Sequence, residues 1–82
     1  LYSVSEDELF SKSKKRAIVD ARHLLYYLCK NRPMKLKYIQ DYMGNNGYNV
    51  GHSSIIHGIE QVTMKIEEDS DYQKVIDSIN VL

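Results

Sequence analysis

The sequence predicts an all-α domain, a small helical bundle that contains a helix-turn-helix. Four segments carry apolar residues at helical spacing, and no segment alternates between apolar and polar residues as a strand does. The 82 residues are enough for one domain with one modest core. Such a core supports a few helices and is too small for an enzyme with a deep cleft.

The first predicted helix is short and spans residues 4–11. Ser5 and Glu8 have the spacing of a capping box, in which each side chain binds the backbone N–H of the other residue. Leu9 and Phe10 follow, and we expect both to pack on the core. Residues 12–16 contain no apolar side chain, so they are expected to form an exposed basic loop.

The next two helices are expected over residues 17–31 and 35–43. The first has one apolar stripe at helical spacing, with Ala17 and Leu24 beside it: Ile18, Ala21, Leu25 and Leu28. Pro33 ends it, because the residue before a proline is pushed out of the helical region. The shorter helix also has one apolar face: Leu36, Ile39 and Met43. Residues 44–51 contain three glycines and three asparagines, which tolerate positive φ and predict an extended turn.

The helix predicted over residues 52–68 has two different faces. Its core stripe consists of Ile55, Ile59, Val62 and Ile66. The other side carries Ser53, His57 and Met64, with Ser54 on the flank. Hydroxyls and imidazoles on such a face can reach base edges or phosphates in the major groove of DNA. For a helix taken alone, a solvated polar face is the more common interpretation.

A closing helix is expected over residues 70–81. Ser70 and Gln73 repeat the capping-box spacing, which predicts that the helix starts just after Ser70. Its apolar face consists of Tyr72, Val75, Ile76 and Ile79. Upstream of it, the helices over 35–43 and 52–68 and the turn between them have the order of a DNA-binding helix-turn-helix, although the turn is long for that motif.

The charges are segregated, although eleven Lys and Arg balance eleven Asp and Glu. Residues 1–10 carry a net charge of −3, residues 11–37 of +8 and residues 38–82 of −5. Nine of the eleven bases therefore lie in one third of the chain: Lys12, Lys14, Lys15, Arg16, Arg22, Lys30, Arg32, Lys35 and Lys37. A basic segment in a neutral domain is typical of a polyanion site, although a solvated charge run gives the same pattern.

Several classes of function are not indicated by the sequence. No apolar run is long enough to span a membrane, and no segment has the pattern of a signal peptide. The single cysteine, Cys29, excludes an internal disulfide and fits a reducing compartment. His52 and Ser53 are neighbours in sequence, and no third group completes a catalytic site. His52 and His57 lie five residues apart on different sides of a helix, so we expect no metal site and no cofactor.

Two motifs resemble the C-terminal DNA-binding domain of the bacterial replication initiator DnaA. Residues 11–22 read Ser-Lys-Ser-Lys-Lys-Arg-Ala-Ile-Val-Asp-Ala-Arg, similar to the family's basic run and the Ile-Val-Glu-Ala-Arg helix that it leads into. Residues 52–57 read His-Ser-Ser-Ile-Ile-His, similar to the family signature His-Thr-Thr-Val-Leu-His. Residues 4–9 are similar to the family's connecting helix, so the resemblance spans about residues 4–80. It implies a Trp-repressor-like helix-turn-helix that binds a short, asymmetric, A/T-rich box.

The resemblance also implies roles for individual residues. Arg16 matches an arginine that enters the minor groove, where a narrow A/T groove favours that residue. Arg22 and His23 match residues that hold the phosphate backbone, and Leu36 and Lys37 match positions that phosphates approach. The major-groove face would consist of His52, Ser53, Ser54 and His57. Further phosphate attraction is expected from Lys12, Lys14 and Lys15.

The chain departs from the family pattern just before the signature. The family has Gly-Gly-Arg-Asp there, whereas this turn is about four residues longer and ends in Val50 and Gly51. Residues 46–49 either supply replacement contacts through Tyr48 or only cap the helix. Glu60 replaces a basic residue and would repel phosphates. Leu1 stands where a starting Met is usual, as in a piece of a longer chain, and no phosphate-binding glycine loop of the initiator's ATPase half is present.

The sequence therefore predicts sequence-specific binding of double-stranded DNA by a monomer. The expected setting is cytoplasmic and nucleoid-associated, in replication initiation or its regulation, without membrane or small-molecule cofactor. The alternative is a protein-docking module, with the acidic segment 67–82 or exposed tyrosines as its face. The tyrosines fit either function, because an aromatic side chain with a polar tip can be half-buried in a core.

Overall fold

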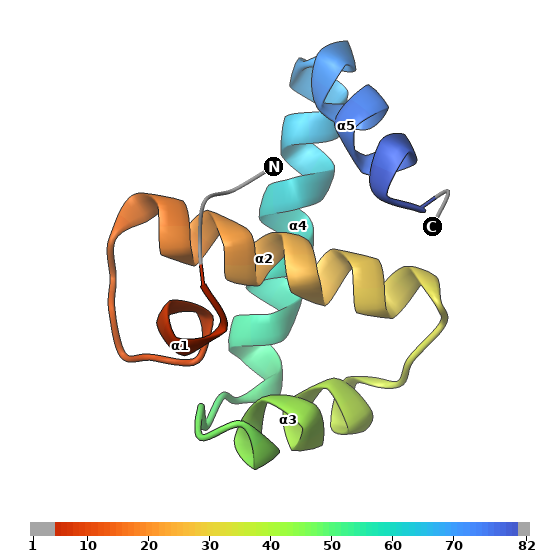
Figure 1. The fold of residues 1–82 in the computed structure, drawn as a ribbon. Helices are drawn as coiled ribbons and strands as arrows, with labels where there is room; N and C mark the ends of the chain where they lie inside the picture. Colours follow the sequence, from red (N-terminus) through yellow and green to blue (C-terminus); the bar gives the residue numbers. More distant parts are fainter. Residues whose placement is uncertain (1–4, 81–82) are drawn as a thin grey trace.

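The computed structural model describes residues 5–80, except for the side chains of residues 75 and 78–80. It contains five helices (Figure 1): α1 (Glu6–Leu9), α2 (Arg16–Asn31), α3 (Leu36–Asn45), α4 (His52–Glu68) and α5 (Ser70–Asn80). No strand occurs within residues 5–80, which confirms the predicted all-α class. None of the described helices is long and apolar enough to cross a membrane.

The largest contact between helices is the crossing of α2 and α4 (Figure 1). At this crossing lies Gly58, a buried residue of α4. A Cβ atom on Gly58 would lie 2.8 Å from Cδ2 of His23 and 2.8 Å from Cδ2 of Tyr26. Both distances are shorter than a carbon–carbon contact allows, so glycine permits the two helices to approach this closely.

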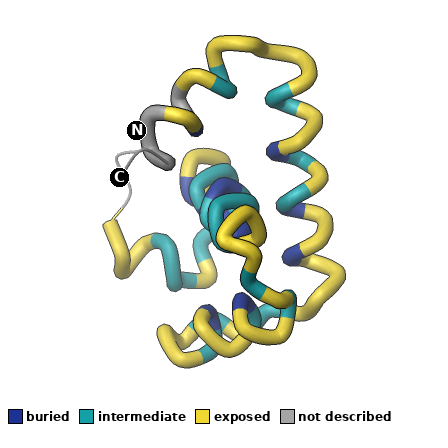
Figure 2. The backbone as a smooth tube through the Cα atoms, turned by 90° about the vertical axis from the view of Figure 1, so that its right-hand side faces the viewer, coloured by how far each residue is buried: buried dark blue, intermediate teal, exposed yellow. Residues whose placement is uncertain are grey.

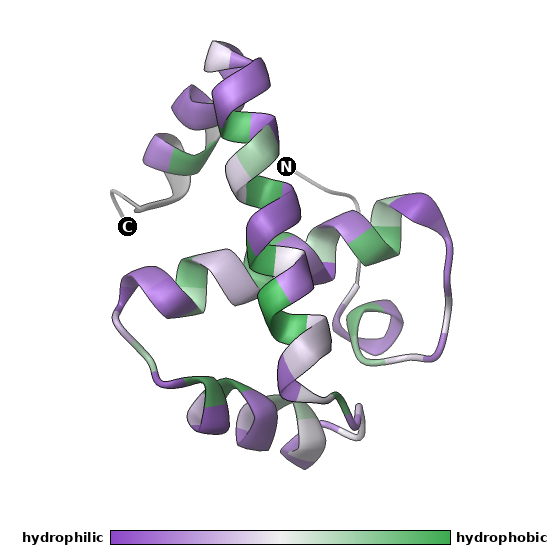
Figure 3. Ribbon diagram, turned by 180° about the vertical axis from the view of Figure 1, so that it is seen from behind, coloured by the Kyte–Doolittle hydropathy of each residue, from purple (hydrophilic) through white to green (hydrophobic). Residues whose placement is uncertain are grey.

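The core consists of two clusters on opposite sides of α2. One joins α2, α3 and α4 through Tyr26, Ile39, Met43 and Ile55. The other joins α2, α4 and α5 through Leu24, Val62 and Ile76. Figure 2 looks along α2 and shows the buried positions of α4 on the side that faces it. Figure 3 shows apolar segments gathered where α4 passes α2 and on the inner side of α3.

The position of α2 between these clusters corrects the expectation of one apolar stripe. Leu24 and Tyr26 are 5% and 3% exposed, although two residues apart on a helix they point in nearly opposite directions. Of the predicted stripe, Ile18 is buried as expected, whereas Ala21, Leu25 and Leu28 are only half-buried. The physical reason is that helices pack on both sides of α2, which its sequence periodicity cannot reveal.

The helix ends are set by local signals. At α1 the predicted capping box is confirmed, because Ser5 accepts a hydrogen bond from the Glu8 backbone and Glu8 from the Ser5 backbone. α3 extends to Asn45, beyond the expected end at Met43. It closes through Gly47 at φ +89°, with the Gly47 N–H donating to the Gly44 carbonyl and the Tyr48 N–H to the Met43 carbonyl.

The predicted capping box of Ser70 and Gln73 is wrong. Ser70 is itself the first residue of α5, and the side chain of Asp69 accepts a hydrogen bond from the Asp71 backbone at 3.0 Å. Gln73 instead donates to Asp77 at 2.7 Å along the helix. Ile76 is buried as expected. The side chains of residues 75 and 79, which we expected on the same face, lie outside the described residues.

Replacing Gly58 with alanine should destabilise the domain, because the new methyl group would push α2 away from α4. Overpacking of this kind costs about 1–3 kcal/mol, and the better helix propensity of alanine offsets about 1 kcal/mol of it. We expect the melting temperature to fall by roughly 5–10 °C in circular dichroism.

The matched control is Gly44→Ala in α3, where a Cβ atom would meet only Asn49 Oδ1, at an ordinary 3.7 Å. This variant should melt at or above the wild-type temperature. Equal melting temperatures for Gly58→Ala and wild type would contradict the assigned role of Gly58.

Candidate nucleic-acid interface

The basic loop that joins α1 to α2 is folded by its serines, while its lysines are exposed. The Ser11 hydroxyl donates to the Glu8 carbonyl at 2.7 Å and accepts from the Ser13 backbone at 3.2 Å. The Ser13 hydroxyl accepts from the Lys15 backbone at 3.3 Å. The charged side chains in and after this loop are exposed: Lys12, Lys14, Lys15 and Arg16. Arg16, expected in the loop, is the first residue of α2.

Arg22 is buried, whereas a residue that holds a DNA phosphate is expected to be exposed. Its side chain is 4% exposed, and its guanidinium donates to three carbonyls of the segment before α2. The bonds to Leu9 and Ser13 are 2.8 and 2.9 Å long, and the third reaches Ser11. The guanidinium thus satisfies backbone groups of the loop. Arg22 is a positioning residue that fixes the basic loop on α2, because a buried and occupied guanidinium has little left to offer a phosphate.

The first turns of α4 present the predicted polar face. Four side chains are exposed: His52, Ser53, Ser54 and His57. Gly51 precedes the helix and supplies no side-chain cap, so the first backbone N–H groups of α4 are left for solvent or a ligand. Glu60 is exposed one turn further along.

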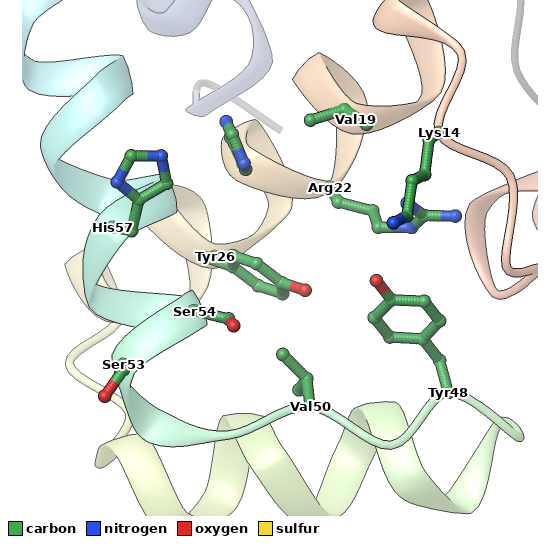
Figure 4. Close-up of a pocket in the computed structure, with 10 residues that line it drawn as sticks. Lys14, Val19, Arg22, Tyr26, Tyr48, Val50, Ser53, Ser54 and His57 are labelled. Carbon is green, nitrogen blue, oxygen red and sulfur yellow. The ribbon is translucent and has the colours of Figure 1, made fainter.

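The basic loop and α4 border one groove of about 660 Å³ (Figure 4). Its wall combines basic, hydroxyl and aromatic side chains from four parts of the chain. They are Lys14, Val19, Arg22, His23, Tyr26, Tyr48, Val50, Ser53, Ser54 and His57. The structure therefore brings together six of the residues singled out in the sequence: Lys14, Arg22, His23, Ser53, Ser54 and His57.

Leu36 and Lys37 do not border this groove. They form the first turn of α3, where Leu36 is half-buried against the core and Lys37 is exposed. Lys35 precedes the helix without a side-chain cap, so the first N–H groups of α3 are open as in α4.

Two groove residues, Tyr48 and Val50, come from the long turn whose role the sequence left open. The turn ends α3 at Gly47 and also places Tyr48 beside Arg22, with the Arg22 Cζ atom 4.4 Å from the ring centroid. Gln40 holds the far end of the turn by donating to the Val50 carbonyl at 2.8 Å. The only sequence signal for Tyr48 was an aromatic residue within a run of Gly and Asn.

His23 lies at the helix crossing and forms the floor of the groove. Its ring is half-buried and meets His57 edge to face, with ring centroids 5.8 Å apart. Burial and the nearby His57 lower the pKa of His23, against a smaller opposing effect of Asp20. Burial raises the pKa of Tyr26 to about 12. Among the described residues, no group of three or more His, Cys, Asp and Glu side chains could hold a metal ion.

Substitution of Arg22 should release the basic loop. Arg22→Ala leaves three carbonyls without their donor, and we expect the free energy of unfolding to fall by about 2–3 kcal/mol. Backbone amides of residues 11–15 should exchange with deuterium faster than in wild type. Arg22→Lys should show the same faster exchange, because one ammonium cannot reproduce the fork of the guanidinium. Unchanged exchange in both variants would contradict this role.

The stability of the domain should depend on the protonation of His23. Because its pKa is lowered from 6.5 in the folded state, the unfolded chain binds the proton more readily. Stability is therefore full above pH 6.5 and declines as the pH falls from 6.5 toward the lowered value. The melting temperature measured between pH 7.5 and 5.5 should drop less in His23→Phe than in wild type, and an equal drop in both proteins would contradict this role of His23.

Comparison with known proteins gives one consistent family. The bacterial dnaA protein helix-turn-helix family matches residues 1–62. The chain is 31% identical over 77 residues to the chromosomal replication initiator protein DnaA of Lachnoclostridium phytofermentans, which covers 93% of this chain and 16% of that protein. It is 27% identical over 82 residues to the DnaA proteins of Flavobacterium psychrophilum and Bacteroides thetaiotaomicron.

The chain thus spans only 16–17% of the length of these relatives. No solved structure matches it at a significant level. The family match includes the basic loop, α2, the long turn and the first part of α4, which are the parts that border the groove. The chain therefore belongs to the bacterial DnaA helix-turn-helix family and is an all-α, non-catalytic DNA-binding module of that family.

Proposed function

We propose that the domain binds double-stranded DNA in a sequence-specific manner that resembles DnaA-box recognition, in replication initiation or its regulation. The observation that carries this proposal is the groove, which Lys14 of the basic loop shares with Ser53, Ser54 and His57 of α4. Side chains suited to phosphates and side chains suited to base edges therefore border the same groove (Figure 4). The DnaA proteins to which the chain is similar are named chromosomal replication initiators.

In this proposal α4 lies in the major groove. His52, Ser53 and His57 are exposed on its first two turns, and hydroxyls and imidazoles can reach base edges there. Arg16 extends from the start of α2 into the adjacent minor groove, where a narrow A/T tract favours arginine. A single copy of the domain contacts both grooves in this arrangement, so the site is asymmetric and a monomer suffices.

Phosphates are bound by the exposed lysines on either side of this surface. Lys12, Lys14 and Lys15 approach the backbone near the minor groove, and Lys37 with the open N–H groups of α3 approaches it on the other side. Roughly 4–6 phosphate contacts of this kind make the affinity fall steeply with salt. Glu60 lies one turn beyond His57 and opposes any phosphate that comes close to it.

The preferred box differs from that of a typical family member. Ser53 and Ser54 lack the methyl group through which threonine contacts the thymine methyl, so any preference for thymine at those positions is weaker. Val50 and Gly51 replace an arginine and an aspartate of the family pattern and offer no base-specific hydrogen bond from a side chain.

The test is binding to fluorescent duplexes by anisotropy across a salt series, with an A/T-rich DnaA-type box and a random pool. Wild type should prefer the box and weaken with salt. Arg16→Ala and His57→Ala should each cost about 1–3 kcal/mol of binding free energy or of box preference, the range for loss of a specific contact.

Lys74→Ala is the matched control, because Lys74 lies on α5, far along the chain from the groove, with its side chain 80% exposed. It should bind like wild type at each salt concentration. Binding that is strong but blind to sequence would leave a DNA-binding domain without box recognition. No binding to either duplex at low salt would overturn the proposal in favour of a protein-docking module.

A further inference from the structure

Tyr48 lines the groove from the long turn, on the side opposite Lys14 of the basic loop. Figure 4 shows its ring beside Arg22, with its hydroxyl directed into the groove toward Tyr26, while Lys14 enters from the opposite side. Ser54 and His57 lie along the α4 side. A ligand that lies in this groove and contacts Lys14 therefore comes close to the Tyr48 hydroxyl.

The backbone of Tyr48 is fixed by the end of α3. Its N–H donates to the Met43 carbonyl at 2.9 Å, and Gly47 before it adopts φ +89°, a conformation that suits glycine. Two residues later the Val50 carbonyl accepts from Gln40 at 2.8 Å. The long turn thus holds Tyr48 in place on both sides rather than leaving it on a loose loop.

The ring and the hydroxyl of Tyr48 have separate roles. One face of the ring covers the Arg22 guanidinium, with Arg22 Cζ 4.4 Å from the ring centroid. Among the described residues the hydroxyl has no hydrogen-bond partner, and the side chain is only half-buried. The ring therefore supports the residue that holds the basic loop, and the hydroxyl remains available to a ligand.

We propose that Tyr48 is a DNA-contacting residue, whose hydroxyl donates a hydrogen bond to a backbone phosphate of the strand that crosses the groove. The inference rests on the proposed function: if α4 lies in the major groove and Arg16 in the minor groove, the strand between those grooves passes over the space between them. A phosphate is the group expected there, because the exposed side chain of Lys14 makes this part of the wall positive.

The contact is particular to this chain rather than to the family pattern. Tyr48 lies in the segment of the turn that lengthens it, and this turn lacks the arginine and aspartate that the family carries before the signature histidine. A neutral hydroxyl bound to a phosphate adds affinity without reading the base sequence. The lengthened turn thus exchanges a base-reading contact for a backbone contact.

The experiment compares wild type with Tyr48→Phe, which keeps the ring over Arg22 and removes only the hydroxyl. Affinities are measured on the A/T-rich duplex and on versions in which one phosphate at a time is replaced by a neutral methylphosphonate. Tyr42→Phe is the matched control, since this exposed tyrosine of α3 does not border the groove. Circular dichroism checks that all three proteins melt at the same temperature.

We expect Tyr48→Phe to bind the unmodified duplex roughly tenfold more weakly, the usual effect of one hydrogen bond to a charged group. The difference should disappear at one methylphosphonate position, and Tyr42→Phe should bind like wild type. Equal affinity of Tyr48→Phe and wild type, or a loss that persists at every methylphosphonate position, would overturn the inference while leaving the proposed function intact. Failure of wild type to bind any duplex would instead overturn the proposed function, and this inference with it.

Discussion

The close crossing of α2 and α4 at Gly58 is the contact on which the rest of the domain depends. Because no side chain separates the helices there, both core clusters can form, with α3 on one side of α2 and α5 on the other. Further along, Lys65 Nζ lies 3.2 Å from Asp20 Oδ1 and links the same two helices. The crossing also sets the angle at which the first turns of α4 leave the core, and so the direction of the face that carries Ser53 and His57.

Arg22 fixes the basic loop on this helical scaffold. A basic loop without apolar residues has no core contacts of its own and would sample many conformations, at an entropic cost whenever it binds a ligand. The three hydrogen bonds of Arg22 to Leu9, Ser11 and Ser13 remove part of that cost before binding. The most buried base of the positive segment thus acts through the loop, while the exposed lysines supply the charge that a polyanion meets.

The neutral overall charge has a physical consequence for such a domain. A uniformly basic surface attracts any polyanion, whereas here the bases are concentrated in residues 11–37, at the two ends of α2, and segment 38–82 is acidic. In the proposed complex with DNA this distribution orients the domain, because the acidic side chains of α5 and the end of α4 would repel phosphates while the basic loop attracts them. The long turn adds the aromatic side chain of Tyr48 to the groove, so the groove differs in chemistry from one lined by lysines alone.

The sequence by itself determined the helices, their order, the polar face of α4, the positive segment and the family, because these are local patterns or direct similarities. Only the tertiary structure decided which of those residues meet. That Arg22 is turned inward, that Leu24 and Tyr26 are both buried, and that Tyr48 lies over Arg22 all depend on neighbours distant in sequence. The periodicity of apolar residues describes one helix at a time. A site that is formed by a loop, a turn and two helices also depends on how closely the helices cross, and here Gly58 permits the close crossing.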